Sequence, residues 1–499
     1  MRYTAYILIL ISINTMAQTN GDWIESGQLK LRVNADGQMA TFNNSAASEL
    51  VSGSNNHLFK FINLWISAID DSNKLHITTV NGFNGKSDYS PGPIDSLTYR
   101  GAEPATWNYV WTVSAGDIKE HRKNFQNANY IVSESIKKWP ANGTDKFYKY
   151  LAPFIDYDED GKYMPEKGDY PDIIGNKASY FIVNDNYSEH KASHGQPLKI
   201  EIYGMAYSLD GLPNTVFTKY FIINRTNVGF KDVKISFHSG FQLGNDNDNY
   251  CGTLVPQNMI FAFNGDANDE NHFGTGMPLA SLIVLNKGLS STLYVMEDSS
   301  LISGMPYTPV QHRTMMEGKW KSSKPLTFGG NGTGNNVNAS FVYPGQTDPA
   351  FIGQNWEENS TPGKRSMLAN MSFPSLGSKK GFIELDIAIS GFDKSDENPY
   401  SFLDKKGTEI KNAWLRKVNS FNKVVNSEYT LQNPIIGGEN FYKEWFNNFE
   451  KIQIYNAQGQ NIIDIKTKVD NRLILNQKGI YYISLISENQ IITKKILIL

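Results

Sequence analysis

The sequence predicts a mainly β protein of several domains, and three observations support this prediction. The chain has 499 residues, enough for two or three domains at about 150 residues per domain. Short runs rich in β-branched and aromatic residues recur along it, bounded by Gly, Asn, Asp and Pro. Asparagine makes up about one residue in ten, and its side chain favours turns. We therefore expect a β-sheet-rich body with a few helices.

The expected elements begin with a hairpin. Residues 28–34 alternate apolar and polar side chains, residues 35–37 offer turn chemistry, and residues 39–42 return. Further strands are expected at residues 58–69, 75–80, 109–113, 179–183, 199–209, 215–223, 233–241, 259–263, 279–286, 341–343 and 381–390. Helices are expected only at residues 117–127, 133–139 and 408–425. The sheets therefore carry the fold.

The charge balance argues against a nucleic-acid partner. The chain has 47 Lys plus Arg and 50 Asp plus Glu, a net charge of −3, whereas nucleic-acid binders show a basic excess or stripe. Only 19% of residues are charged and 12% are aromatic, a composition typical of a folded chain rather than a disordered one.

The first residues predict export. Arg2 precedes an apolar run at residues 6–13, and the small-residue pattern that ends at Ala17 meets Gln18, as in a signal peptide of residues 1–17. The run is shorter than the ~20 residues of a membrane helix, and we expect no transmembrane segment in the mature chain. With one cysteine, Cys251, no intramolecular disulfide can form, and we expect this thiol to be buried.

The composition changes near residues 433–434, where a helical segment gives way to a compact β pattern. Short apolar strands are expected at residues 451–455, 462–465, 473–475, 481–485 and 491–499, separated by turns rich in Asn and Gly. The pattern predicts a β-sheet-rich body at residues 18–431 and a small β-sandwich domain at residues 432–499.

The tail also carries recognisable motifs: NPIIGG at 433–438, IQIYNAQGQNI at 452–462, KGIYYISL at 478–485 and TKKILIL at 493–499. In this order they resemble the type A C-terminal sorting domain of the Bacteroidetes type IX secretion system. The resemblance implies Sec export to the periplasm, then transfer by the type IX secretion machinery to the outer cell surface or the medium. It places the sorting signal on Gly459, Gly479, Tyr481, Lys494 and Lys495.

The body resembles uncharacterised exported proteins of the same bacteria that carry this tail. The matching segments extend over almost the whole mature chain and include LWISAID at 64–70, LAPFIDYDEDGKYMPEKGDYPDI at 151–173, PLKIEIYGMAYSLD at 197–210 and NTVFTKYFIINRT at 214–226. The resemblance implies one integrated architecture and supplies no catalytic residues.

One motif has clear chemistry, the acidic sequence DYDEDG at residues 156–161. Ca²⁺ is bound by roughly six to eight oxygens, and carboxylates at every second position curl around it when a Gly permits a sharp turn. The candidate ligands are Asp156, Asp158, Asp160 and the Lys162 carbonyl, with closure by Glu166 or Asp169. The loop is not an EF-hand, because position twelve is Lys167 and Pro153 excludes a preceding helix. The alternative is a solvated acidic turn.

Other motifs indicate no catalytic site. His190 and His194 are four residues apart, but Gly195-Gln196-Pro197 prevents the helix that a zinc pair needs. The glycines at 329–334 precede a strand-like run rather than a helix, which favours a surface loop over a phosphate site.

Two classes of function remain. The first is a cell-surface or secreted binding or structural protein, with a calcium-stabilised loop, that contacts glycans or surface proteins. The alternative is a secreted hydrolase of polysaccharide or peptide. Two carboxylates roughly 5 to 10 Å apart in an aromatic-lined cleft would distinguish the hydrolase.

Overall fold

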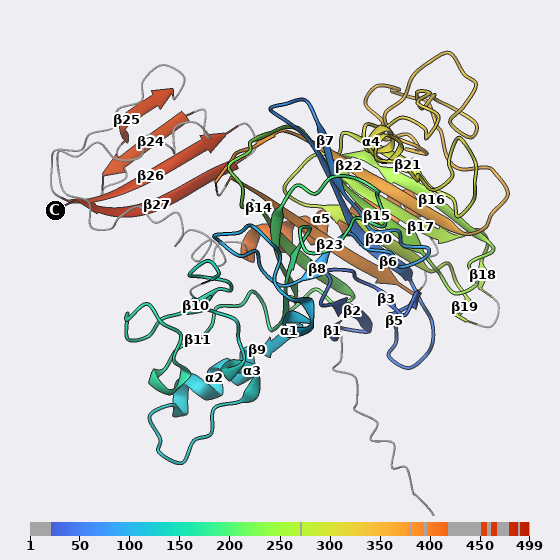
Figure 1. Ribbon diagram of the computed structural model, residues 1–499. Coiled ribbons are helices and arrows are strands. Elements are labelled where there is room, and N and C mark those ends of the chain that lie inside the picture. Colours follow the sequence, from blue (N-terminus) through green and yellow to red (C-terminus); the bar gives the residue numbers. More distant parts are fainter. Residues whose placement is uncertain are drawn as a thin grey trace, which may run out of the picture.

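The computed structural model describes residues 21–144, 146–269, 272–379, 381–393, 397–417, 451–456, 461–466, 479–487 and 490–498 (Figure 1). The described chain is mainly β and contains several antiparallel sheets, which confirms the predicted fold class. None of the described helices is long and apolar enough to cross a membrane.

The largest sheet has nine strands in the order β16-β17-β20-β23-β14-β13-β12-β8, with β9 also paired to β12. Their bounds are β8 Ser90–Pro91, β9 Trp111–Ser114, β12 Lys177–Asn184, β13 Ile200–Ser208, β14 Thr215–Asn224, β16 Asn249–Leu254, β17 Met259–Asn264, β20 Leu279–Val284 and β23 Phe382–Phe392. Both faces of its central strands are buried: along β13, Ile202 and Ala206 face one core, while Tyr203 and Tyr207 face another. Burial on both sides explains the long apolar runs of the sequence.

A second sheet packs on the first face of the large sheet. Its order is β21-β22-β15-β6-β7, and a bridge between Met39 and Ile62 joins it to the small sheet β1-β2-β5. The bounds are β1 Gly21–Ser26, β2 Leu29–Asn34, β5 Ser48–Leu50, β6 Phe59–Asp70, β7 Leu75–Thr78, β15 Phe230–Phe241, β21 Ser291–Tyr294 and β22 Arg365–Leu376. Ile66 and Phe237 belong to the same core as Ile202 and Ile222 of the large sheet. The body is therefore built on a β-sandwich.

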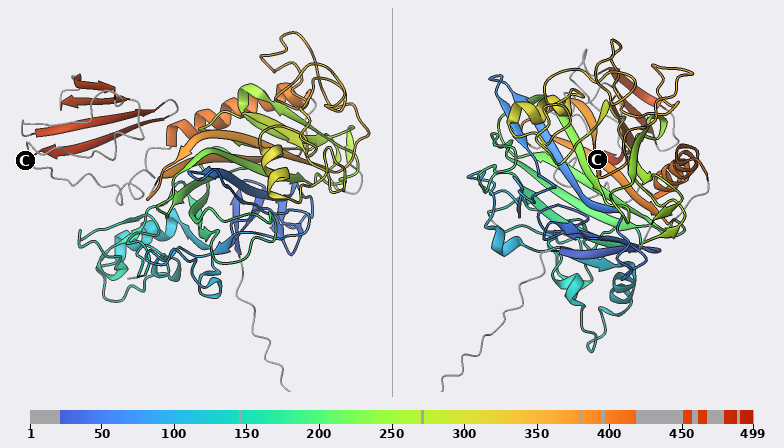
Figure 2. Two further views of the ribbon diagram at one scale, coloured as in Figure 1. Left: turned by 45° about the horizontal axis from the view of Figure 1, so that its top comes forward. Right: turned by 90° about the vertical axis from the view of Figure 1, so that its right-hand side faces the viewer.

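The second face of the large sheet is covered by helices and loops. These are the segment between β8 and β12 and the helix α5 (Pro399–Lys417), which runs along the sheet in Figure 2. The segment contains α1 Pro104–Trp107, α2 Ala115–Asn124, α3 Glu134–Lys137, β10 Phe154–Ile155, η1 Pro165–Lys167 and β11 Tyr170–Pro171. Helix α2 begins with a capping box, in which Ser114 accepts a hydrogen bond from the Asp117 N–H and Asp117 accepts one from the Ser114 N–H. This covering segment carries the acidic loop.

The helix α4 (Pro309–Met316) packs outside the five-stranded sheet. Asn370 of β22 donates a hydrogen bond to the Met315 carbonyl, and Arg313 donates one to Ser67 of β6. The remaining short elements are β3 Thr41–Phe42, β4 Ser45–Ala46, η2 Val255–Gln257, β18 Asn268–Asp269 and β19 Gly274–Thr275.

Four strands near the C-terminus form a separate antiparallel sheet in the order β25-β24-β26-β27. Their bounds are β24 Lys451–Asn456, β25 Asn461–Lys466, β26 Gly479–Ser487 and β27 Gln490–Ile498. The strands expected at 451–455, 462–465 and 481–485 lie here, as do residues 491–498 of the last expected strand. Residue 499 and the strand expected at 473–475 fall outside the described residues.

Three sequence predictions about elements need correction. Residues 341–343 form no strand, and Tyr343 there has a positive φ of 48°. The expected hairpin has its turn, where the Asn34 N–H donates to the Gln38 carbonyl, but β2 pairs mainly with β1 and β5. The last helix begins at Pro399 rather than at residue 408, because Asn398 caps it by accepting from the Tyr400 and Ser401 N–H groups.

The single cysteine is buried, as the sequence predicts. Cys251 lies in β16 in the core of the sandwich, and burial raises the pKa of its thiol well above the ordinary value. Dithiothreitol is therefore expected to leave the melting temperature of the protein unchanged. A large fall on reduction, measured by calorimetry with and without the reductant, would reveal an intermolecular disulfide and contradict this burial.

Candidate metal centre in the acidic loop

The acidic loop joins two short paired strands of the covering segment. Phe154 pairs with Pro171 and Ile155 with Tyr170, so β10 and β11 bring residues 156 and 169 to the same end of a ribbon. This pairing explains why the loop closes through Asp169, one of the two closures that the sequence left open.

Three carboxylates of this loop converge. Oxygens of Asp156, Asp158 and Asp169 lie within 4.8 Å of one another, and Asp169 is fully buried while Asp156 is half-buried and Asp158 exposed. Oxygen ligands at this spacing from three separate side chains are the donor set that Ca²⁺ prefers. Glu166 is exposed and does not belong to the group.

Backbone N–H groups fix the shape of the loop. Asp156 accepts from the Asp160 and Gly161 N–H groups at 3.2 and 2.7 Å, and Gly161 takes a positive φ of 76° that suits glycine. Asp169 accepts from the Tyr157 and Met164 N–H groups, both at 2.7 Å. Each of these oxygens keeps a further lone pair for a cation.

A lysine ammonium lies against the other side of the loop. Lys167 Nζ is 3.0 Å from Asp158 Oδ2 and 2.7 Å from Asp160 Oδ2. Its hydrogen bond to Asp160 lowers the pKa of that carboxyl and, with the one to Asp158, raises the pKa of Lys167. Asp160 therefore pairs with Lys167 instead of joining the three-carboxylate group. Lys162 contacts the loop carboxylates through its backbone N–H, which donates a hydrogen bond to Asp160 at 2.9 Å.

Of the three carboxylates, Asp169 is the buried one, and its negative charge is the most unfavourable. Burial raises the pKa of Asp169, the hydrogen bonds from Met164 and Tyr157 oppose this, and the charges of Asp156 and Asp158 raise it further. A bound divalent cation would turn this mutual repulsion into attraction.

The other predicted functional residues have simpler outcomes. Ala17, Gln18 and Gly459 lie outside the described residues. Gly479 and Tyr481 lie in β26 and Lys494 and Lys495 in β27, where Tyr481 pairs with Ile496 and Tyr482 with Lys495.

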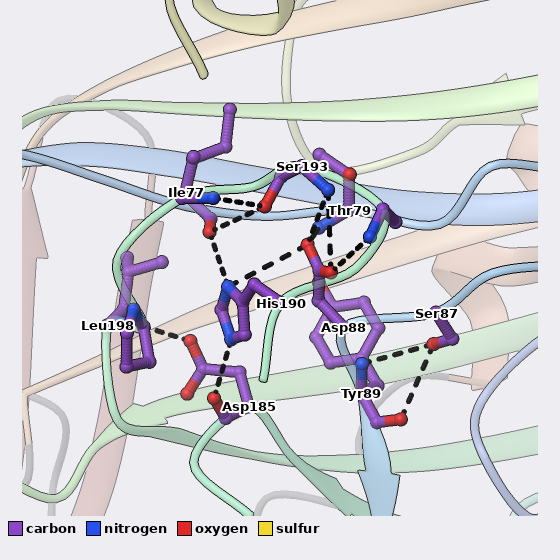
Figure 3. A network of polar contacts seen from close by, with 12 residues as sticks. Ile77, Thr79, Ser87, Asp88, Tyr89, Asp185, His190, Ser193 and Leu198 are labelled. Atoms are coloured by element: carbon purple, nitrogen blue, oxygen red, sulfur yellow. Dashed lines mark hydrogen bonds and ion pairs between the residues drawn. The ribbon is translucent and has the colours of Figure 1, made fainter. Parts of the chain in front are cut away.

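A buried polar network surrounds His190, and the sequence did not predict it (Figure 3). His190 Nδ1 is 2.9 Å from the Ile77 carbonyl oxygen, and Nε2 is 2.8 Å from that of Asp185. Both carbonyls only accept, so the ring carries a proton on each nitrogen. Asp88, fully buried, lies 3.7 Å from Nδ1 and balances the positive charge. The imidazole is thus a structural cation, in line with the sequence argument against a zinc pair.

The two carboxylates of this network both hold the loop between β12 and β13. Asp88 accepts from the Thr79, Ala192 and Ser193 N–H groups. Asp185 accepts from Leu198 at 2.7 Å and from Ile200 at 2.8 Å, and burial raises its pKa. The network therefore fastens the loop between β12 and β13 to the end of β7.

Replacing His190 is expected to destabilise the body markedly. His190→Gln removes the cation and leaves Asp88 buried without its counter-charge, at a cost of about 3 kcal/mol in the free energy of unfolding. Urea titration followed by tryptophan fluorescence measures this loss. The matched control is His194→Gln, because His194 lies in the same loop and is exposed. Equal stability of the two variants would refute the structural cation.

Comparison with known proteins gives no assignment. No protein-family model matches the chain. No curated protein matches it either.

Proposed function

We propose that this chain is a secreted or cell-surface protein that leaves the periplasm through the type IX secretion machinery. The observation that carries the proposal is the agreement between the tail motifs and the C-terminal strands. The described residues of the motif at 452–462 lie in β24 and β25, those of the motif at 478–485 in β26, and those of the motif at 493–499 in β27. The secretion machinery recognises a sorting signal of this kind as a folded domain. A sheet whose strands pair with one another fits such recognition.

The body is proposed as a binding or structural module that contacts glycans or other surface proteins. Its strongest buried charges serve internal contacts: Glu201 pairs with Arg225, His190 lies between Asp88 and Asp185, and Lys219 pairs with Asp386. These groups stabilise the sandwich and its covering loops, which supports a rigid scaffold.

Calcium is proposed as the ligand of the acidic loop, held by Asp156, Asp158 and Asp169. The support is the convergence of their oxygens within 4.8 Å and the N–H contacts that aim them. Lys167 lies on Asp158 and competes for it. The ion stabilises the covering segment rather than performing chemistry.

The test of the body's function is a glycan and peptide array probed with the mature full-length chain and read for both binding and cleavage. Retention of a glycan or surface peptide without cleavage is the expected result. Release of new sugar ends or peptide fragments would instead support the secreted hydrolase.

A further inference from the structure

Four polar side chains, from β14, β23 and the residues that follow β20, meet beneath α5. Lys219 of β14 lies directly opposite Asp386 of β23, Glu384 lies two residues away, and Asn286 follows β20 on the other side of β23. The side chains of Lys219, Asp386 and Glu384 are 0%, 1% and 11% exposed. Lys219 also contacts Glu384, and Trp414 of α5 lies beside Asp386. The cluster is therefore largely shielded from water.

One carboxylate oxygen in this cluster contacts both an amine and a carboxamide. Asp386 Oδ2 is 3.1 Å from Lys219 Nζ and 3.2 Å from Asn286 Nδ2. On the carboxamide's other side, the Asp386 N–H donates to Asn286 Oδ1 at 2.9 Å. Asp386 therefore contacts both a nucleophile, the Lys219 amine, and a leaving group, the Asn286 amide nitrogen, which also donates to the Glu384 carbonyl oxygen at 3.2 Å.

We propose that Lys219 and Asn286 join through an intramolecular amide bond, formed by the protein itself with Asp386 carrying the proton. The cross-link would connect β14 to the end of β20 across β23. A chain with one cysteine has no intramolecular disulfide, and a bond of this kind restrains the unfolded chain in the same way.

The atoms balance without a co-reactant. Asp386 takes a proton from the Lys219 ammonium, and the neutral Nζ attacks Cγ of Asn286 while the carbonyl electron pair moves to Oδ1, held by the Asp386 N–H. The Cγ–Nδ2 bond then breaks, Asp386 returns its proton to Nδ2, and the nitrogen departs as ammonia. The second proton of Nζ leaves with it, so ammonium is the product and Lys219 becomes a neutral amide.

The surroundings suit this proton transfer. Burial raises the pKa of Asp386 to about 6, so its carboxyl can hold a proton near neutral pH. Burial disfavours the Lys219 ammonium, but the charges of Asp386 and Glu384 outweigh burial and raise the pKa of the lysine. The amine is therefore charged at rest, and we expect a slow reaction that occurs once, after folding.

Intact-mass spectrometry of the full chain tests the proposal. The expected mass is about 17 Da below the sum of its residues, the loss of one ammonia. Because an N-terminal Gln18 also loses ammonia when it cyclises, a tryptic map must show the peptides of Lys219 and Asn286 joined, with no cleavage after Lys219. An uncross-linked pair of peptides, or a bond from Lys219 to Glu384 or Asp386 with loss of water, would overturn the proposal.

Two variants separate chemistry from folding. Lys219→Arg keeps the positive charge and cannot form the amide, and Asp386→Asn keeps the size of the side chain and removes the proton carrier. In both, the branched peptide is expected to disappear while circular dichroism reports a folded chain. A branched peptide that persists in Asp386→Asn would refute the role of Asp386. The mass of the wild-type chain shows whether the cross-link forms, even where a variant fails to fold.

Discussion

Deleting residues 432–499 is expected to leave a folded body in the periplasm. The described strands of the tail pair only with one another, so the sandwich and its covering segment keep their strand partners without them. What the truncated protein loses is the folded address that we propose for the type IX machinery. Cell fractionation with an antibody against the body should find the protein in the periplasmic fraction and reduce the surface and medium fractions to background.

Two controls make this result decisive. The truncated body should show the same circular dichroism and melting behaviour as the body in the full chain, which excludes misfolding as the cause. A paired variant, Lys494→Ala with Lys495→Ala, leaves the tail in place and is expected to weaken export. Normal surface or medium levels of the truncated protein would refute the sorting assignment.

Calcium is expected to stabilise the full chain, and Asp158→Ala is expected to abolish that response. Extracellular calcium modules have Kd values of about 10⁻⁴ to 10⁻³ M, so at ten times Kd the ion contributes roughly 1.4 kcal/mol. Chelation should therefore lower the melting temperature by about 2 °C. The Asp158 side chain belongs to the exposed edge of the carboxylate group, and its truncation creates no large cavity.

Neighbouring residues of the same loop provide the calcium controls. Glu159→Gln removes an exposed charge outside the carboxylate group and should leave the calcium response intact. Lys167→Gln should tighten calcium binding, because the ammonium 3.0 Å from Asp158 competes with the ion. Calorimetric titration with no heat and no stabilisation up to several millimolar calcium would leave a solvated acidic turn as the better description.

The calcium response should also weaken on acidification. Burial raises the pKa of Asp169, and calcium binds the ionised carboxylate, so a proton must leave before the ion is held. Titrations at successively lower pH should show a rising Kd. A Kd that does not change with pH would exclude Asp169 as a ligand.

Most of the strands could be predicted from the sequence because their apolar runs are long. The segments 199–209 and 215–223 correspond to β13 and β14, which are buried on both faces. Strand β22 was not predicted because it contains the polar or strand-breaking residues Ser366, Asn370 and Pro374. Tertiary contacts accommodate them, such as the hydrogen bond from Asn370 to Ser291. The start of α5 carried a usable signal, Asn398 followed by Pro399, which is typical of a helix N-terminus.

The acidic loop could be predicted because most of its carboxylates are close together in the sequence. Its pairing with Lys167 could not, since that contact depends on the turn at η1. The networks around His190 and Lys219 could not be predicted from the sequence for a different reason. Lys219 and Asp386 are far apart in the chain and meet only through strand register, which the sequence does not reveal.

The most direct test of the central claim is to transfer residues 432–499 to a periplasmic reporter in a host that has the type IX machinery. The reporter carries its own signal peptide, and the measured quantity is its activity on the surface of intact cells and in the medium. We predict that the tail moves the reporter out of the periplasm, and that the same fusion stays inside a host strain lacking the machinery. A reporter retained in the periplasm of the competent host would contradict the proposed export function.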